Sequence, residues 1–148
     1  MSADSLALRA LRGATTAPAN STEAITEAVG ELIEALVSRN ELEGSRVLSV
    51  TFSVTADLDA CFPAAIARRR EDWGTVALLD CQQMAVAGDL ERCIRLLAHV
   101  WMPAAQEVTH TYLRQAVRLR PDLAAAAAVG PENHTPASSL ADHCGDGG

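Results

Sequence analysis

The chain has 148 residues, of which 49% are hydrophobic and 21% are charged, proportions typical of one globular domain and not of a disordered protein. Its net charge of −7, from 12 cationic and 19 acidic side chains, argues against nucleic-acid binding, because phosphates would be repelled. No stretch has the roughly 18 apolar residues of a membrane helix, so we expect no membrane association. The four cysteines form no CxxC pair and no secretory leader is evident, which predicts a cytoplasmic protein with reduced thiols.

The first third of the chain predicts a strand followed by a helix. Side chains alternate in character over residues 6–16, as in a strand, and we expect this strand to stop near Gly13. Asn20 and Glu23 have the spacing of a capping box at a helix start. Apolar residues then recur at helical spacing to about Asn40, which predicts an amphipathic helix.

The remaining elements alternate between strand and helix patterns. Strict alternation over residues 48–54 predicts a half-buried strand, and residues 63–70 resemble a short helix. The apolar run at residues 75–81 predicts a central strand covered on both faces. We expect a helix over residues 89–99, with its first residue as the N-cap, and a further strand over residues 109–119.

These elements predict an α+β fold, a single domain with a mixed β-sheet and flanking helices. We assign residues 1–129 to this domain. Residues 130–148 are rich in Gly, Pro, Ser and Asp and have no apolar period, which predicts a flexible C-terminal tail.

The residue types that could carry chemistry are arginines. The sequence contains no GxSxG, no phosphate-binding glycine loop, no HExxH and no metal-ligand spacing among its histidines and cysteines. Arg12 lies at the end of the first predicted strand, and Arg95 near the N-terminal end of the helix that follows the central strand. Residues 68–70 are three further arginines, and Tyr112 lies on the last predicted strand. Such groups suit a polyanionic organic ligand, although each could also be a solvated surface charge.

Five short blocks in a fixed order resemble a known family. They are RGATT at residues 12–16, ACFPA at 60–64, QQM at 82–84, CIR at 93–95, and YL followed by LRPDL between 112 and 123. This pattern closely resembles the small monofunctional AroH-class chorismate mutases, and the likeness runs from Leu8 to Leu123.

The resemblance implies a homotrimer of the pseudo-α/β-barrel type, with a mixed sheet core and three sites between subunits. It implies conversion of chorismate to prephenate by an intramolecular Claisen rearrangement, in phenylalanine and tyrosine biosynthesis, with no cofactor and no metal. The residues that match the family's substrate-binding positions on one subunit are Arg12, Arg95 and Tyr112. Those that match positions usually supplied by the neighbour are Phe62, Ala64 and Arg68. Leu78, Leu79, Leu119 and Arg120 complete the substrate-binding set.

The chemistry of that reaction suits these residue types. Chorismate is a dianion, and bidentate arginines both bind and orient carboxylates. Negative charge develops on the ether oxygen as its C–O bond breaks, and a preplaced cation there, for which Arg95 is our candidate, would act as an oxyanion hole does. The reaction has one reactant, so electrostatic stabilisation and restriction of the substrate to its reactive conformer must supply the acceleration.

Three positions depart from the family pattern. Ala65 replaces a common lysine, Gln83 replaces the glutamate expected at the ring hydroxyl of the substrate, and Asp80 replaces a cysteine. We expect Asp80 and Gln83 to act with Arg95 as the catalytic set, with Asp80 contacting the hydroxyl. Residues three apart point to opposite faces of a regular strand, so this requires the strand to end or bulge near residues 81–82.

Two other functions compete with this interpretation. The altered Asp80 and Gln83 pair would also suit a non-catalytic or weakly active relative that senses carboxylates of the aromatic pathway. A trimeric imine deaminase of the YjgF kind would share the general architecture, but the ordered motifs fit it poorly.

Overall fold

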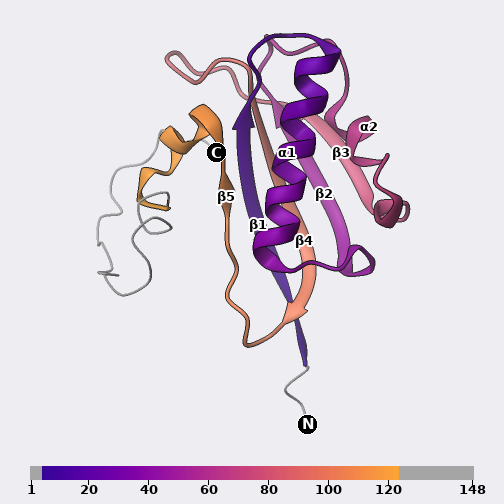
Figure 1. Cartoon of the computed structure of the whole chain (residues 1–148). Helices are drawn as coiled ribbons and strands as arrows, with labels where there is room; N and C mark the ends of the chain where they lie inside the picture. The colour runs from indigo at the N-terminus through magenta and orange to yellow at the C-terminus, as the bar shows by residue number, and fades with distance from the viewer. Residues whose placement is uncertain (1–4, 124–148) are drawn as a thin grey trace.

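The computed structural model describes residues 5–123, in which five strands form one mixed sheet in the order β3-β2-β4-β1-β5 (Figure 1). The strands are β1 (Leu6–Thr16), β2 (Val47–Val54), β3 (Ala77–Gln82), β4 (Cys93–Pro103) and β5 (Thr111–Tyr112). The long strands β1 and β4 pair antiparallel along their full length, and β2 pairs antiparallel with the other side of β4. The outer strands β3 and β5 are parallel to their neighbours β2 and β1.

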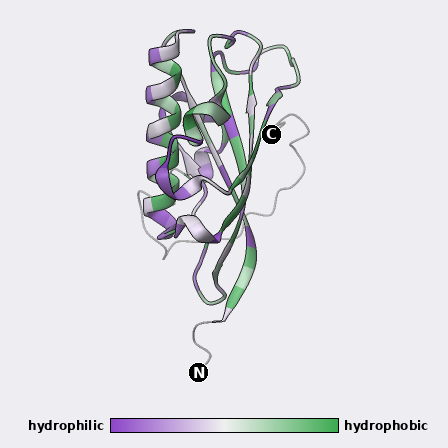
Figure 2. Cartoon of the chain, turned by 90° about the vertical axis from the view of Figure 1, so that its right-hand side faces the viewer, coloured by the Kyte–Doolittle hydropathy of each residue, from purple (hydrophilic) through white to green (hydrophobic). Residues whose placement is uncertain are grey.

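Two helices, α1 (Thr22–Asn40) and α2 (Pro63–Ala67), lie on the same side of the sheet (Figures 1 and 2). The apolar stripe of α1 is fully buried against inward-facing residues of the strands, and this contact forms the core. Its largest buried side chains include Leu32, Leu36, Leu11, Phe52 and Leu96. The residues therefore form an α+β domain with a mixed sheet, as the sequence predicts, but helices cover only one face of that sheet.

The other side of the sheet, which we call the open face, has no helix over it among residues 5–123. Its side chains are the alternate strand residues that point away from α1. Several are large and apolar yet exposed, with Leu8 51%, Leu79 58%, Leu97 37% and Trp101 40% exposed. Register places Leu8 opposite Trp101, so apolar surface runs across the central strands.

Short 3₁₀ segments complete the described chain: η2 (Gly44–Arg46), η3 (Glu71–Trp73) and η4 (Arg114–Leu119). Gly44 packs directly against Asp72, so η2 and η3 lie side by side. No helix within residues 5–123 has the length and apolar character needed to cross a bilayer. The predicted tail at residues 130–148 lies outside the described residues.

The predicted helix at residues 89–99 is wrong, because this part of the chain belongs to β4. Ile94 and Leu97 satisfy a helical spacing, but the segment also alternates, with every second residue from Ile94 to Met102 buried against α1. Pairing with β1 on one side and with β2 on the other provides hydrogen-bond partners for the backbone of this segment. This pairing explains why the segment is a strand. Arg95 is therefore on a central strand and not at a helix N-terminus.

The predicted strand at residues 109–119 is also wrong beyond its first part. Only Thr111 and Tyr112 pair with β1. Arg114 then adopts a left-handed backbone with φ 54°, which turns the chain out of the sheet and into η4.

The strand predicted at residues 75–81 exists as β3, but it is an edge strand and not a central one. It pairs only with β2, and half of its side chains face the open face, where Leu79 is exposed. Its continuous apolar run therefore does not reflect helices on both faces.

The end of β1 and the start of α1 also differ from the predictions. β1 continues past Gly13, where an added Cβ would lie 3.3 Å from Leu32 of α1 and from the Thr111 carbonyl oxygen, so this glycine allows close packing. The N-cap of α1 is Ser21, whose Oγ accepts the Ala24 N–H at 3.1 Å. Asn20 instead accepts backbone N–H groups from residues 59 and 60.

Candidate active site

Arg95 is the most constrained of the predicted site residues. It lies on β4, is 4% exposed, and forms an ion pair with Asp89 in which Nη2 donates to Oδ1 at 3.0 Å. Nη1 approaches the second carboxylate oxygen at 3.5 Å. Burial alone would raise the pKa of Asp89, but hydrogen bonds from Arg95 and from the Leu90 N–H hold it below its ordinary value. The Nε–H of Arg95 is buried without an acceptor among residues 5–123.

Gln83 lies close to Arg95 on the open face. Its backbone N–H donates to the Val54 carbonyl at 2.7 Å, and its side-chain Oε1 accepts the Ser53 hydroxyl at 2.5 Å. Ser53 is the register partner of Arg95 across β2 and β4. Because directly paired residues project to the same face, Gln83 and Arg95 both project from the open face beside Ser53.

Asp80 is on the opposite face of the sheet. Its register partner is Phe52, which is fully buried under the helices. The Asp80 Oδ1 accepts the Ala64 N–H at 3.0 Å, so this carboxylate caps the N-terminus of α2, where the preceding residue supplies no side-chain cap. Burial raises the pKa of Asp80, although the Ala64 N–H and the Arg68 charge lower it.

The irregularity expected at residues 81–82 is therefore absent. The β2–β3 ladder is regular from Ser49 and Ala77 to Val54 and Gln82, and the Gln83 N–H continues it. Asp80 and Gln83 of one chain consequently cannot face the same pocket, and the hypothesis that they line one pocket from one strand is wrong.

Asp80 belongs instead to a group of residues around α2. Phe62 precedes this helix and is 70% exposed, Ala64 is buried within it, and Arg68 is exposed at its C-terminal end. Leu78 lies on the same side of β3 as Asp80, whereas Leu79 lies on the open face. We call Phe62, Ala64, Arg68 and Asp80 the α2 group.

Arg12, Tyr112 and Arg120 gather at the other edge of the sheet, around His110. The Nδ1 of His110 accepts the Arg12 N–H at 3.0 Å. Burial lowers the pKa of His110, and the positive charges of Arg120 and Arg12 lower it further. The pKa of Arg120 is raised, chiefly by its ion pair with Asp122, and Tyr112 acts in the same direction.

Leu119 is the last residue of η4 and precedes Arg120. The sequence did not point to His110, and it predicted Asp89 only as the N-cap of a helix, whereas Asp89 pairs with Arg95. These contacts with Arg12 and Arg95 depend on strand pairing and loop folding, which local patterns do not define. Among residues 5–123, no group of three or more potential ligands could hold a metal ion.

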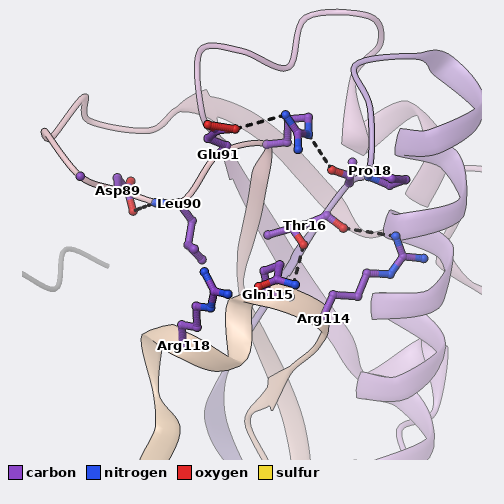
Figure 3. Close-up of a pocket in the computed structure, with 11 residues that line it drawn as sticks. Thr16, Pro18, Asp89, Leu90, Glu91, Arg114, Gln115 and Arg118 are labelled. Atoms are coloured by element: carbon purple, nitrogen blue, oxygen red, sulfur yellow. Dashed lines mark hydrogen bonds and ion pairs between the residues drawn. The ribbon is translucent and has the colours of Figure 1, made fainter.

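A cavity of about 770 Å³ lies between the end of β1, the loop at residues 88–92 and η4 (Figure 3). Arg114 and Arg118 of η4 line it, and in Figure 3 the Arg118 side chain extends toward Leu90. None of the predicted site residues lines this cavity, but it adjoins Arg95 through Asp89, which lines it and pairs with Arg95.

Comparisons with known proteins identify the family. A sequence profile described as chorismate mutase type I matches residues 8–123. The chain belongs to this family. It is 36% identical over 117 residues to chorismate mutase AroH of Bacillus subtilis, covering 78% of this chain and 92% of that protein. It is 41% identical over 122 residues to chorismate mutase AroH of Thermus thermophilus, covering 80% and 98%.

The fold agrees with this assignment. A chorismate mutase structure from Clostridium thermocellum superimposes with a TM-score of 0.67 at 37% identity, covering 73% of this chain and 96% of that one. The chain is thus an isomerase by family, and the comparisons do not favour the non-catalytic alternative.

Proposed function

We propose that this chorismate mutase converts chorismate to prephenate at sites between the subunits of a homotrimer, in the phenylalanine and tyrosine branch of aromatic biosynthesis. One observation carries the proposal. Arg95 and Gln83 lie on the open face, whereas the α2 group lies around the helix side of β3. The sheet separates the two sets within one chain, so one pocket that contains both must draw them from two chains.

The open face supports association with further copies of the chain. It exposes apolar side chains across the central strands, among them Leu97 and Trp101, which a neighbouring subunit would remove from water. Arg12 is the register partner of Leu97, so association over this face would bring a second chain next to the arginines. The pseudo-barrel arrangement of three sheets is part of this proposal.

Arg95 is suited to stabilising the transition state. Its position on a central strand and its ion pair fix the guanidinium before substrate binds, which is the preorganisation that electrostatic catalysis requires. The unpartnered Nε–H is a donor for a substrate oxygen. Arg12, Tyr112 and Arg120 would bind the substrate from the same chain, with Leu119 beside them.

The ring hydroxyl of chorismate has two possible partners from two different chains. Gln83 shares the open face with Arg95 and can bond the hydroxyl from the same subunit. Asp80 can reach that pocket only as part of the neighbour's α2 group, with Phe62, Ala64 and Arg68. Leu78 and Leu79 of β3 would then contribute apolar walls.

The activity is tested by following the ultraviolet absorbance of chorismate with purified protein. Loss of the Arg95 cation should slow turnover by about 10²–10³-fold, the effect of removing one oxyanion-hole donor. Arg95→Lys keeps the charge and shows whether the bidentate geometry is needed, while Arg39→Ala, an exposed arginine of α1, should stay within about twofold of the wild type. A wild-type protein that does not consume chorismate overturns the proposal.

The reaction needs no general base, so we expect a nearly flat rate between about pH 6.5 and 8.5. A bell-shaped profile with limbs near neutrality would indicate acid–base chemistry and contradict this mechanism. The described cysteines 61, 81 and 93 are free thiols, which suits the cytoplasmic location that we propose.

The site between subunits has a separate test in mixed oligomers. Light scattering should give three times the chain mass of 15.6 kDa, and a monomer would contradict the proposal. Co-assembly of Arg95→Ala and Arg68→Ala chains in equal amounts should restore about a quarter of the sites, because each restored site takes one intact residue from each chain. No recovery above the single variants would show that one chain supplies both arginines.

A further inference from the structure

The pairing between β5 and β1, which holds the segment with Tyr112 against the sheet, is short. Only two residue pairs join these strands, Gly13 with Thr111 and Ala14 with Tyr112, and the Leu113 N–H adds one bond to the Ala14 carbonyl at 2.9 Å. A two-residue parallel pairing is weak by itself. Side chains must therefore fix the segment that carries Tyr112.

Two side chains hold the chain just before β5. Asn40, which is buried at the end of α1, donates to the Thr109 carbonyl at 2.9 Å and accepts the Thr109 N–H at 2.7 Å. His110 follows, and its Nδ1 accepts the Arg12 N–H at 3.0 Å. This imidazole thus takes the place of a backbone carbonyl at the next step of the ladder.

We propose that His110 is a positioning residue of the active site, acting as a neutral imidazole that accepts the Arg12 N–H and holds Arg12 and Tyr112 in register. The inference rests on the proposed function, in which these two residues bind substrate. Because Nδ1 accepts a hydrogen bond, the ring proton of the neutral form is on Nε2. His110 itself need not touch the substrate.

The surroundings of His110 favour this neutral form. The charged groups that face it are Arg12 from β1 and Arg120 from the end of η4, the latter paired with Asp122. Both arginines and burial lower the pKa of His110. Protonation would place an N–H against the Arg12 N–H and add a third positive charge, so the register of Arg12 and Tyr112 should loosen in acid.

Three substitutions of His110 test whether its function depends on the hydrogen bond from the Arg12 N–H or only on a polar side chain at this position. Asn has its Oδ1 the same number of bonds from Cβ as the histidine Nδ1, so His110→Asn keeps the acceptor and removes the titration. His110→Gln carries its acceptor one bond further out, and His110→Leu has none. In chorismate turnover at pH 7.5, kcat/KM should fall about tenfold in the Gln and Leu variants, as when one buried hydrogen bond is lost, and less than threefold in the Asn variant.

The pH profile gives a readout that a merely structural role would not move. Wild-type kcat/KM should decline in acid, at pH values below the ordinary imidazole pKa of 6.5, as His110 protonates, whereas His110→Asn should stay flat through that range. Equal activity of the Leu variant and the wild type would overturn the proposal, and so would the same acid decline in the wild type and the Asn variant.

Nuclear magnetic resonance of the ring nitrogens tests the hydrogen bond without activity. The resonances that disappear in His110→Asn should show an unprotonated Nδ1 at pH 7.5 and a titration midpoint below 6.5. A protonated Nδ1 overturns the proposal. If the wild type fails to consume chorismate, the proposed function fails, and the ring nitrogens still decide the role of His110.

Discussion

Replacing Asp89 with asparagine removes the negative charge that neutralises Arg95. The Arg95 side chain is 5% exposed and that of Asp89 20% exposed. Removing one partner of a fully buried ion pair costs about 3–5 kcal/mol because the other charge is left uncompensated. Since Asp89 is partly solvated and asparagine retains one acceptor, we expect a loss of about 2–3 kcal/mol in the free energy of unfolding, or about 10 °C in melting temperature.

The same loop offers a matched control. Glu91→Gln removes a carboxylate that pairs with Arg92, but these side chains are 74% and 38% exposed, and such pairs contribute about 0–1 kcal/mol. Thermal and urea unfolding of both variants should be compared at equal protein concentration, because assembly adds concentration-dependent stability. A melting temperature of Asp89→Asn within about 2 °C of the wild type, or equal to that of Glu91→Gln, would refute the reasoning.

The pH dependence of the Asp89 effect follows from its lowered pKa. In the folded protein the pKa of Asp89 lies below its ordinary value of 3.8, so the stabilisation is complete well above that value. It is lost as the pH falls through the folded pKa, because the unfolded chain then binds the proton first. The difference between the wild type and Asp89→Asn should therefore shrink below about pH 4.

Substitutions at three further positions test the packing described above by urea unfolding. Gly30→Ala should stabilise α1 by about 0.5–1 kcal/mol, since no atom lies within 4 Å of the added Cβ; a loss of stability would contradict this. Gly44→Ala should lower the free energy of unfolding by about 1–3 kcal/mol, because its Cβ would meet the Asp72 carbonyl oxygen. An unchanged free energy of unfolding would show that η2 and η3 separate easily. Asp80→Ala should cost about 1 kcal/mol through the lost cap on Ala64, whereas Asp80→Asn retains an acceptor and should cost less than half of that; equal losses would rule out the capping role.

The hydrophobic pattern alone predicts those elements whose periodicity fits only a helix or only a strand. The apolar stripe between Ile25 and Leu36 fits only a helix, and the alternation over residues 48–54 fits only a strand, so both predictions are confirmed. The ordered motifs likewise identified the family, because they depend on residue identity and spacing and not on which segments pair.

The partner of each strand was decided only in three dimensions. Ile94 and Leu97 suit either a helix or a strand, and pairing with β1 and β2 on both sides made this segment β4. The same sheet order put β3 at an edge and sent Asp80 and Gln83 to opposite faces. The hydrogen bond between Arg12 and His110 and the ion pair between Arg95 and Asp89 could not be predicted from the periodicity of the sequence. The periodicity of the sequence indicates which face of each element is buried away from water. It does not indicate which distant residues form hydrogen bonds with each other, because strand pairing must satisfy the backbone N–H and C=O groups of the whole sheet at once.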